Sequence, residues 1–163
     1  MIYDYRDKEN NVSIWLGDCN SLKELNTYLS TVYIDNEIDA GEILNKLFLP
    51  CNQNRPFEQE LRNTFDEHYN QFEYDFGLSF DDDFIEANVL EKFSDNIDVL
   101  LDGFSSSDTF LEEVKRSIGN PLAKSYNAIV ILYNFKYDGR ATEIKHKNLN
   151  LYFIGNFSCE SAA

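Results

Sequence analysis

Three consecutive carboxylates, Asp81-Asp82-Asp83, are the residues of this chain whose type and spacing come closest to a cation site. A calcium loop places oxygen ligands at alternate positions, with a glycine at the sixth place and a glutamate at the twelfth. Counting from Asp81, those places hold Glu86 and Lys92, so the calcium pattern fails. Magnesium held by two carboxylates stays open, in a hydrolase with Asp81 and Asp83 as ligands.

Other catalytic chemistry has few candidates. His68 and His146 have no sequence neighbours that suggest a triad or a metal pair, and we expect both to be structural or exposed. The cysteines form no C-x-x-C pair, and Gly17 stands alone after the first strand, where a phosphate-binding loop would need several glycines. We therefore expect no enzyme activity, no cofactor and no metal.

Acids and aromatics are concentrated between Arg62 and Lys92, an interval with nine acidic residues and no lysine or arginine. Acidic patches accelerate encounter with basic partners, and aromatic side chains supply contact area once the partner is bound. The interval therefore supplies the candidate partner-binding residues. They are Asp66, Glu73, Tyr74, Asp75, Asp81, Asp82 and Asp83.

The net charge of −15, from 29 acids against 14 bases, argues against a nucleic-acid ligand, whose phosphates would be repelled. The acids are concentrated before residue 121, and the remaining residues are mildly basic. This distribution indicates one strongly negative surface. Solubility is the alternative explanation of such a charge.

The residues of this acidic interval need a helix to position them. Leu61, Phe65, Tyr69, Phe72 and Phe76 fall on one stripe of a helix over residues 61–76, and most of the acids project outside that stripe. Its acids are therefore expected to face water or a partner. Tyr74 falls nearly opposite the stripe, between two acids, and Gly77 ends the helix.

The rest of the chain predicts an α+β fold. A strand is expected at residues 12–16, and a helix follows it because Ser21 and Glu24 form a capping box. Further predicted helices begin near Asp39, Ser94 and Ser106, and the last of them is closed by Gly119. The remaining predicted strands span residues 84–89, 126–135 and 149–157, and the last two are expected to pair as a hairpin.

These elements predict one domain over residues 1–163, with a largely antiparallel sheet of about four strands and helices mainly on one face. Three cysteines leave one over if two were joined, which suits a reducing cytoplasm. No apolar run approaches the ~20 residues of a membrane span, and the N-terminus lacks a signal-peptide pattern. We therefore expect a cytoplasmic protein that is not associated with a membrane.

Three segments resemble the bacterial immunity protein 22 family of polymorphic toxin systems. They are Val12-Ser13-Ile14-Trp15-Leu16-Gly17, the run from Phe72 to Glu86, and the later strands. The resemblance implies an α+β cytoplasmic protein that binds and neutralises a cognate toxin domain without catalysis. Trp15 and Gly17 match the tryptophan strand of the family.

Together, resemblance and charge predict an inhibitor of a basic toxin domain, with a nuclease as the expected activity of that toxin. One alternative is a nucleic-acid mimic that inhibits a DNA-binding protein, and the magnesium-dependent hydrolase is a less favoured one. The sequence leaves open the oligomeric state, the identity of the toxin and whether its active site or a neighbouring site is blocked.

Overall fold

The computed structural model describes residues 3–4, 10–33 and 68–158. A five-stranded antiparallel sheet with the strand order β6-β7-β2-β9-β8 forms its centre. In chain order these strands are β2 (Asn11–Cys19), β6 (Ile85–Ser94), β7 (Tyr126–Tyr133), β8 (Glu143–Lys145) and β9 (Leu149–Ser158). Two strand pairs lie outside it. They are β1 (Tyr3–Asp4) with β5 (Leu78–Ser79) and β3 (Thr31–Tyr33) with β4 (His68–Asn70).

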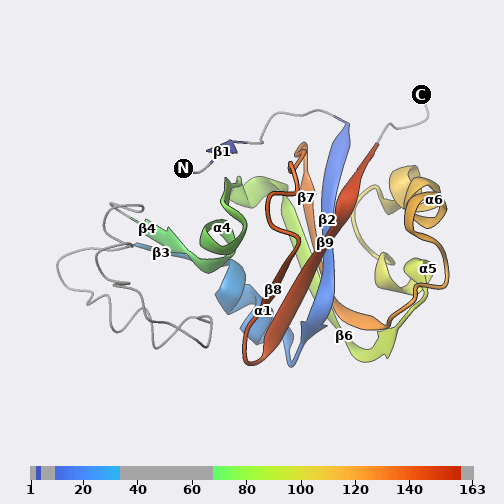
Figure 1. The fold of residues 1–163 in the computed structure, drawn as a ribbon, viewed down its shortest axis with the longest axis horizontal. Coiled ribbons are helices and arrows are strands. Elements are labelled where there is room, and N and C mark those ends of the chain that lie inside the picture. The colour runs from blue at the N-terminus through green and yellow to red at the C-terminus, as the bar shows by residue number, and fades with distance from the viewer. Residues whose placement is uncertain (1–2, 5–9, 34–67, 159–163) are drawn as a thin grey trace.

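Helices cover both faces of the sheet. Figure 1 shows α1 and α4 on one side of it and α5 and α6 on the other. The helices are α1 (Leu22–Leu29), α4 (Gln71–Phe76), α5 (Ile97–Leu100) and α6 (Ser107–Ile118), with a short 3₁₀ helix η1 (Asp82–Phe84) before β6. The predicted α+β class with an antiparallel sheet is confirmed. The structure differs in having five central strands and helices on both faces.

The two covered faces follow from the sequence of the central strands. Residues 12–16 of β2 and 128–132 of β7 are all buried, so neither strand has a solvent-facing side. Strands that are buried on both faces have continuous apolar sequences, as β7 does in Ala-Ile-Val-Ile-Leu. One layer of helices could therefore not have covered this sheet.

The predicted hairpin of the last two long strands is wrong. β2 lies between them and pairs antiparallel with both, so that Trp15 is opposite Val130 on β7 and Phe153 on β9. Pairing β7 directly with β9 would have left the apolar β2 at an edge of the sheet. The central position of β2 buries its whole apolar run.

Trp15 is the centre of the aromatic core on the α1–α4 face. Its ring centroid lies 5.1 Å from that of Phe72, 5.6 Å from Phe76, 5.5 Å from Tyr137 and 5.1 Å from Phe153. On the opposite face, a second core joins the sheet to α5 and α6. Its residues include Ile14, Leu16, Leu100, Phe110, Val114, Ile129 and Ile131.

Two predicted helix boundaries in the first half of the chain are confirmed by the structure. The Ser21 hydroxyl accepts a hydrogen bond from the backbone N–H of Glu24 and caps α1. Gly77, with φ 65°, ends α4 in the left-handed region. None of the described helices has the length and apolar character that crossing a membrane requires.

The predicted helix over residues 61–76 is wrong in its described part. Residues 68–70 form β4, and α4 begins only at Gln71, because the Asn70 side chain caps it by accepting from the backbone N–H of Glu73 (3.0 Å). Residues 61–67 and the helix predicted near Asp39 lie outside the described residues. The helix predicted to begin near Ser94 also starts later in the chain. Ser94 is the last residue of β6, and Asn96 caps α5.

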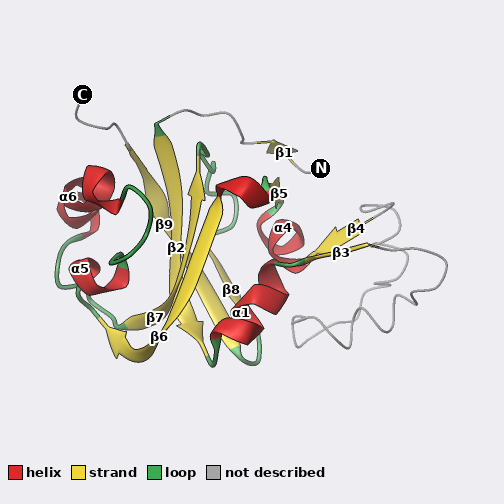
Figure 2. Ribbon diagram, turned by 180° about the vertical axis from the view of Figure 1, so that it is seen from behind, coloured by secondary structure: helices red, strands yellow, loops and turns green. Residues whose placement is uncertain are grey.

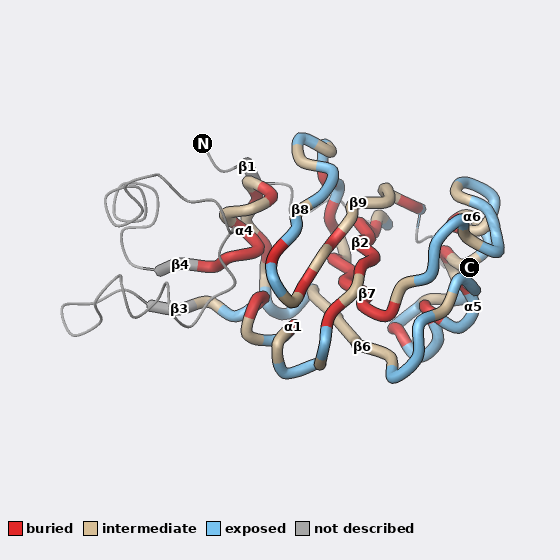
Figure 3. Tube along the Cα trace, turned by 60° about the horizontal axis from the view of Figure 1, so that its bottom comes forward, coloured by how far each residue is buried: buried red, intermediate tan, exposed pale blue. Residues whose placement is uncertain are grey.

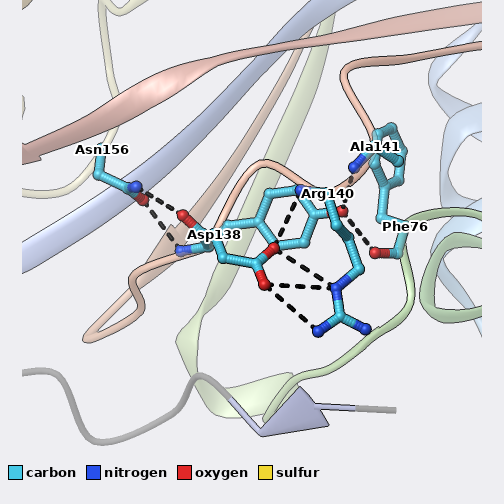
Figure 4. Close-up of polar contacts among 6 residues, drawn as sticks. Phe76, Asp138, Arg140, Ala141 and Asn156 are labelled. Carbon is cyan, nitrogen blue, oxygen red and sulfur yellow. Dashed lines mark hydrogen bonds and ion pairs between the residues drawn. The ribbon is translucent and has the colours of Figure 1, made fainter. Parts of the chain in front are cut away.

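Tyr137 fastens α4 to the segment between β7 and β8. Its hydroxyl donates to the carbonyl of Phe76 and accepts from the N–H of Ala141, while the side chain of Asn156 bonds its backbone (Figure 4). Burial disfavours the phenolate and raises the pKa of Tyr137 to about 12, although the Ala141 hydrogen bond opposes this shift. An unfolded tyrosine has a pKa of about 10.

The stability of the protein should therefore fall at high pH. The folded state holds the Tyr137 proton more tightly, so this contribution is present below about pH 10 and is lost as the pH rises toward 12. We expect the free energy of unfolding to drop by about 1–3 kcal/mol over this range. Urea unfolding at each pH measures it. The Tyr137→Phe variant should lack this component of the drop, and an identical profile for both proteins would contradict the assignment.

Candidate partner-binding surface

Two of the predicted binding acids, Glu73 and Asp75, have buried side chains. Glu73 is 5% exposed, and its carboxylate accepts from the backbone N–H of Phe80 at 3.0 Å. The side chain of Asp75 is 4% exposed. The prediction that these acids face water is wrong for both side chains, because Glu73 bonds the backbone of Phe80 and Asp75 bonds Tyr28 and His146.

Asp75 joins three elements that are distant in sequence. Its carboxylate accepts from the Tyr28 hydroxyl of α1 at 2.8 Å and from the Gln71 amide of α4 at 2.9 Å, and it lies 2.7 Å from Nε2 of His146, which follows β8. The His146 side chain is 1% exposed. This buried pair explains the second histidine: it is structural, as predicted, and its partner is the carboxylate of Asp75.

The other predicted residues have different surroundings. Asp82 and Asp83 are exposed, and Asp81 is half-buried. Tyr74 is half-buried as well, so it is not the fully exposed aromatic that the helical projection predicts. Asp66 lies outside the described residues.

The three aspartates form a turn into β6. The Asp81 carboxylate accepts from the backbone N–H of Asp83 at 2.9 Å and so caps η1. Within the described ranges, no three His, Cys, Asp or Glu side chains group as a metal site requires.

Acidic side chains continue beyond the predicted interval. Residues 81–113 contain eleven acids and one base, Lys92. We call the part of the surface formed by η1, β6, α5 and the start of α6 the β6–α5 surface. Its exposed acids are Asp82, Asp83, Glu91, Asp95, Asp98, Asp102, Asp108 and Glu112. Figure 3 shows the end of β6 and the neighbourhood of α5 as largely exposed.

Exposed apolar side chains lie on the same surface. Phe84 is 42% exposed, Phe93 is 56% exposed and Val99 is 46% exposed. Among the described residues these are three of the four large hydrophobic residues that are exposed, and Leu22 is the fourth. Aromatic residues in an otherwise polar surface are typical anchors of protein interfaces. The sequence indicated Tyr74 as the exposed aromatic because the interval was projected as one helix, whereas Phe84 and Phe93 are more exposed than the half-buried Tyr74.

Glu86 fixes the loop before α6 against β6. Its carboxylate accepts from the backbone N–H of Ser105 at 2.8 Å, from the Ser105 hydroxyl, and from the Tyr133 hydroxyl at 3.0 Å. Burial opposes ionisation of Glu86, but these hydrogen bonds outweigh it and keep its pKa below the ordinary value. The loop and strand therefore form one continuous face, and Glu86 is a support of that face.

Three hollows border the start of β6. One of about 240 Å³ lies beside Phe80, Asp81 and Phe84. A second, of about 430 Å³, lies between the end of α1 and β6, and a third, of about 320 Å³, lies between β6 and residues 102–104. The β6–α5 surface is thus acidic, exposes two phenylalanine side chains and is bordered by hollows. Exposed aromatic residues and complementary charge are common features of protein interfaces in general.

A comparison with protein families decides the class. The family model for Immunity protein 22 matches residues 12–160. The chain belongs to the immunity protein 22 family. Searches of curated proteins and of solved structures found no match. An immunity function and a toxin partner follow from the family, whose members are generally non-catalytic.

The tryptophan strand of this immunity protein has a structural role. Trp15 is fully buried in the aromatic core, and Gly17 lies against β9, where an added Cβ would be 1.8 Å from the carbonyl oxygen of Asn150. Neither residue can contact a toxin in the folded protein. The sequence resemblance therefore rests partly on residues that fix the centre of the sheet.

Proposed function

We propose that this immunity protein neutralises a basic toxin domain, a nuclease, by binding it through the β6–α5 surface. The observation that carries the proposal is the coincidence of eight exposed acids with Phe84, Phe93 and Val99 on neighbouring elements. Nucleases bind polyanions with basic surfaces, which an acidic surface complements. No chemical step by the immunity protein is required.

The predicted binding residues divide into two groups under this proposal. Asp81, Asp82 and Asp83 belong to the contact surface, together with the acids that follow Lys92. Glu73 and Asp75 support it from inside, because their carboxylates are bonded to Phe80, Tyr28 and Gln71. Tyr74, which is half-buried beside them, contacts the toxin at the periphery of the surface. Asp98 contributes less, because it is paired with Lys115 at 2.7 Å.

Binding to a candidate toxin domain, taken from a gene adjacent to that of this protein, tests the proposal. We expect a tight complex that suppresses cleavage of plasmid DNA or total RNA by the toxin. Its association rate should fall by about 10-fold or more between 50 and 500 mM NaCl, because long-range charge attraction is screened. Surface plasmon resonance gives the rate, and a cleavage assay gives the inhibition.

A double charge reversal provides the specific comparison. Asp83→Lys with Asp95→Lys should slow association strongly. Glu143→Gln, on β8 at the opposite edge of the sheet, is the control and should leave the rate within about twofold. Affinity that does not change with salt, or an equal effect of both variants, would contradict binding through the β6–α5 surface.

A further inference from the structure

β6 is an edge of the central sheet. On its inner side residues 85–89 pair with β7, and on its outer side no described strand pairs with it. Every residue from Ile85 to Leu90 is half-buried. This burial is expected of a strand that has β7 along one edge and helices over its two faces (Figure 2). An edge strand presents a row of unpaired backbone N–H and C=O groups, and natural proteins usually protect such a row.

Within the described part of the chain, features that protect this edge begin only after Val89. The register with β7 shifts between Val89 and Ser94, and Lys92 follows within the shifted part. Irregular pairing and lysine are both common ways to blunt an edge. The regular stretch Ile85–Val89 has neither, and five residues is about the length of an average strand. The opposite edge, β8, spans only three residues.

Two of the hollows lie on either side of this stretch. Figure 2 shows β6 between α1 on one side and α5 and α6 on the other. The hollow toward α1 is lined by Asn26, Leu29, Asp82 and Ile85, among others, and the hollow toward the α5–α6 loop is lined by Glu86, Asp102 and Phe104. Ala87 borders both hollows. They therefore open on the two faces of the sheet at the same point of its edge.

This geometry suits an added strand. Side chains of a strand point alternately to the two faces of a sheet, so a strand beside Ile85–Val89 would place successive side chains in the two hollows. Each hollow has an acidic side chain that is exposed: Asp82 in one and Asp102 in the other. The complementary side chains are lysine or arginine.

We propose that the toxin contributes an extended segment, with lysine or arginine on both of its faces, that pairs with Ile85–Val89 as a sixth strand of the sheet. This inference rests on the proposed function. Main-chain hydrogen bonds supply the pairing, and the two acidic hollows select the side chains. The Phe84 side chain then lies at one end of the added strand and can pack over that end.

Amide hydrogen exchange of the protein alone and with the neighbouring toxin domain tests the pairing. Alternate amides of residues 85–89 point outward, and we expect these to exchange at least about 100-fold more slowly in the complex, since they become hydrogen-bonded. The alternate, inward amides already pair with β7 and should change less. The amides of Glu143–Lys145 on β8 are the internal control and should not change.

Matched charge reversals test the side-chain pockets. Asp82→Lys and Asp102→Lys change charge inside the hollows, and Asp108→Lys makes the same change on α6 outside them. We expect each of the first two to weaken binding by about 10- to 100-fold, and the third by less than about fivefold. Thermal unfolding midpoints within about 2 °C of the wild type confirm that each variant is folded.

The outcomes separate the inference from the proposed function. If the toxin binds but residues 85–89 gain no alternating protection, strand addition is wrong and toxin binding by the β6–α5 surface stands. Equal weakening by all three lysine variants would also contradict strand addition, because general charge attraction would then explain the binding. If the toxin domain does not bind at all, both fall.

Discussion

Gly17→Ala is expected to destabilise the protein by about 4–5 kcal/mol or more, which is a large part of the ~5–15 kcal/mol that holds a domain folded. The added Cβ would lie 1.8 Å from the carbonyl oxygen of Asn150 and 3.0 Å from the Cα of Leu151. Both atoms belong to the backbone of β9, which pairs with β2 along its whole length. No side-chain rotation relieves this contact, so β2 and β9 must separate locally.

Urea unfolding followed by circular dichroism measures this effect. Gly103→Ala is the matched control, because nothing lies within 4 Å of its added Cβ and only its φ of 85° opposes alanine. The control should cost about 1–2 kcal/mol, the usual strain of a left-handed residue. Equal losses in the two variants would show that the contact with β9 is relieved and that Gly17 is not required for close approach.

The local signals in the sequence predicted the elements well where partners are near in the chain. Ser21 and Glu24 form the capping bond three residues apart, and Gly77 ends α4 as predicted. Strand positions around Trp15 and residues 126–133 were also predicted, because runs of apolar, branched and aromatic residues fit the pleated surface of a buried strand. Such signals depend on neighbours within a few residues.

The errors concern contacts between distant residues. The order of the strands could not be read from turn signals, since β2 enters between β7 and β9 from more than one hundred residues away. The burial of Asp75 depends on Tyr28 and His146, which are 47 and 71 residues distant. A helical projection contains no such partners, so it places a polar side chain in water by default.

The candidate surface was predicted in part. The three aspartates were found, because consecutive acids are visible in any reading. The acids after Lys92 were missed because a single lysine ended the base-free interval, although the acidic region continues to Glu113. Exposure of Phe84 and Phe93 could not be predicted, since the edge position of β6 follows only from the strand order.

Asp75→Lys should reduce stability and Asp83→Lys should reduce toxin affinity, although both residues come from the same acidic interval. Asp75 is buried and holds Tyr28, Gln71 and His146. The lysine ammonium at this buried position cannot accept hydrogen bonds, so Tyr28 and Gln71 would lose their acceptor. It would also place a positive charge beside His146. We expect a loss of about 3–5 kcal/mol in the free energy of unfolding. Asp83 is exposed, and its reversal should change that free energy by about 0.5 kcal/mol or less.

Toxin affinity distinguishes the two roles when it is measured on the folded fraction. Asp83→Lys should weaken binding while unfolding is unchanged. Asp75→Lys should weaken binding only as far as it unfolds the protein, so affinity corrected for the folded fraction should be near that of the wild type. A conservative Asp75→Asn change, which keeps the shape and loses the charge, should fall between wild type and Asp75→Lys in stability. A fully stable Asp75→Lys protein with lost affinity would instead place Asp75 at the toxin interface, because only a side chain that reaches the partner could separate the two measurements in that way.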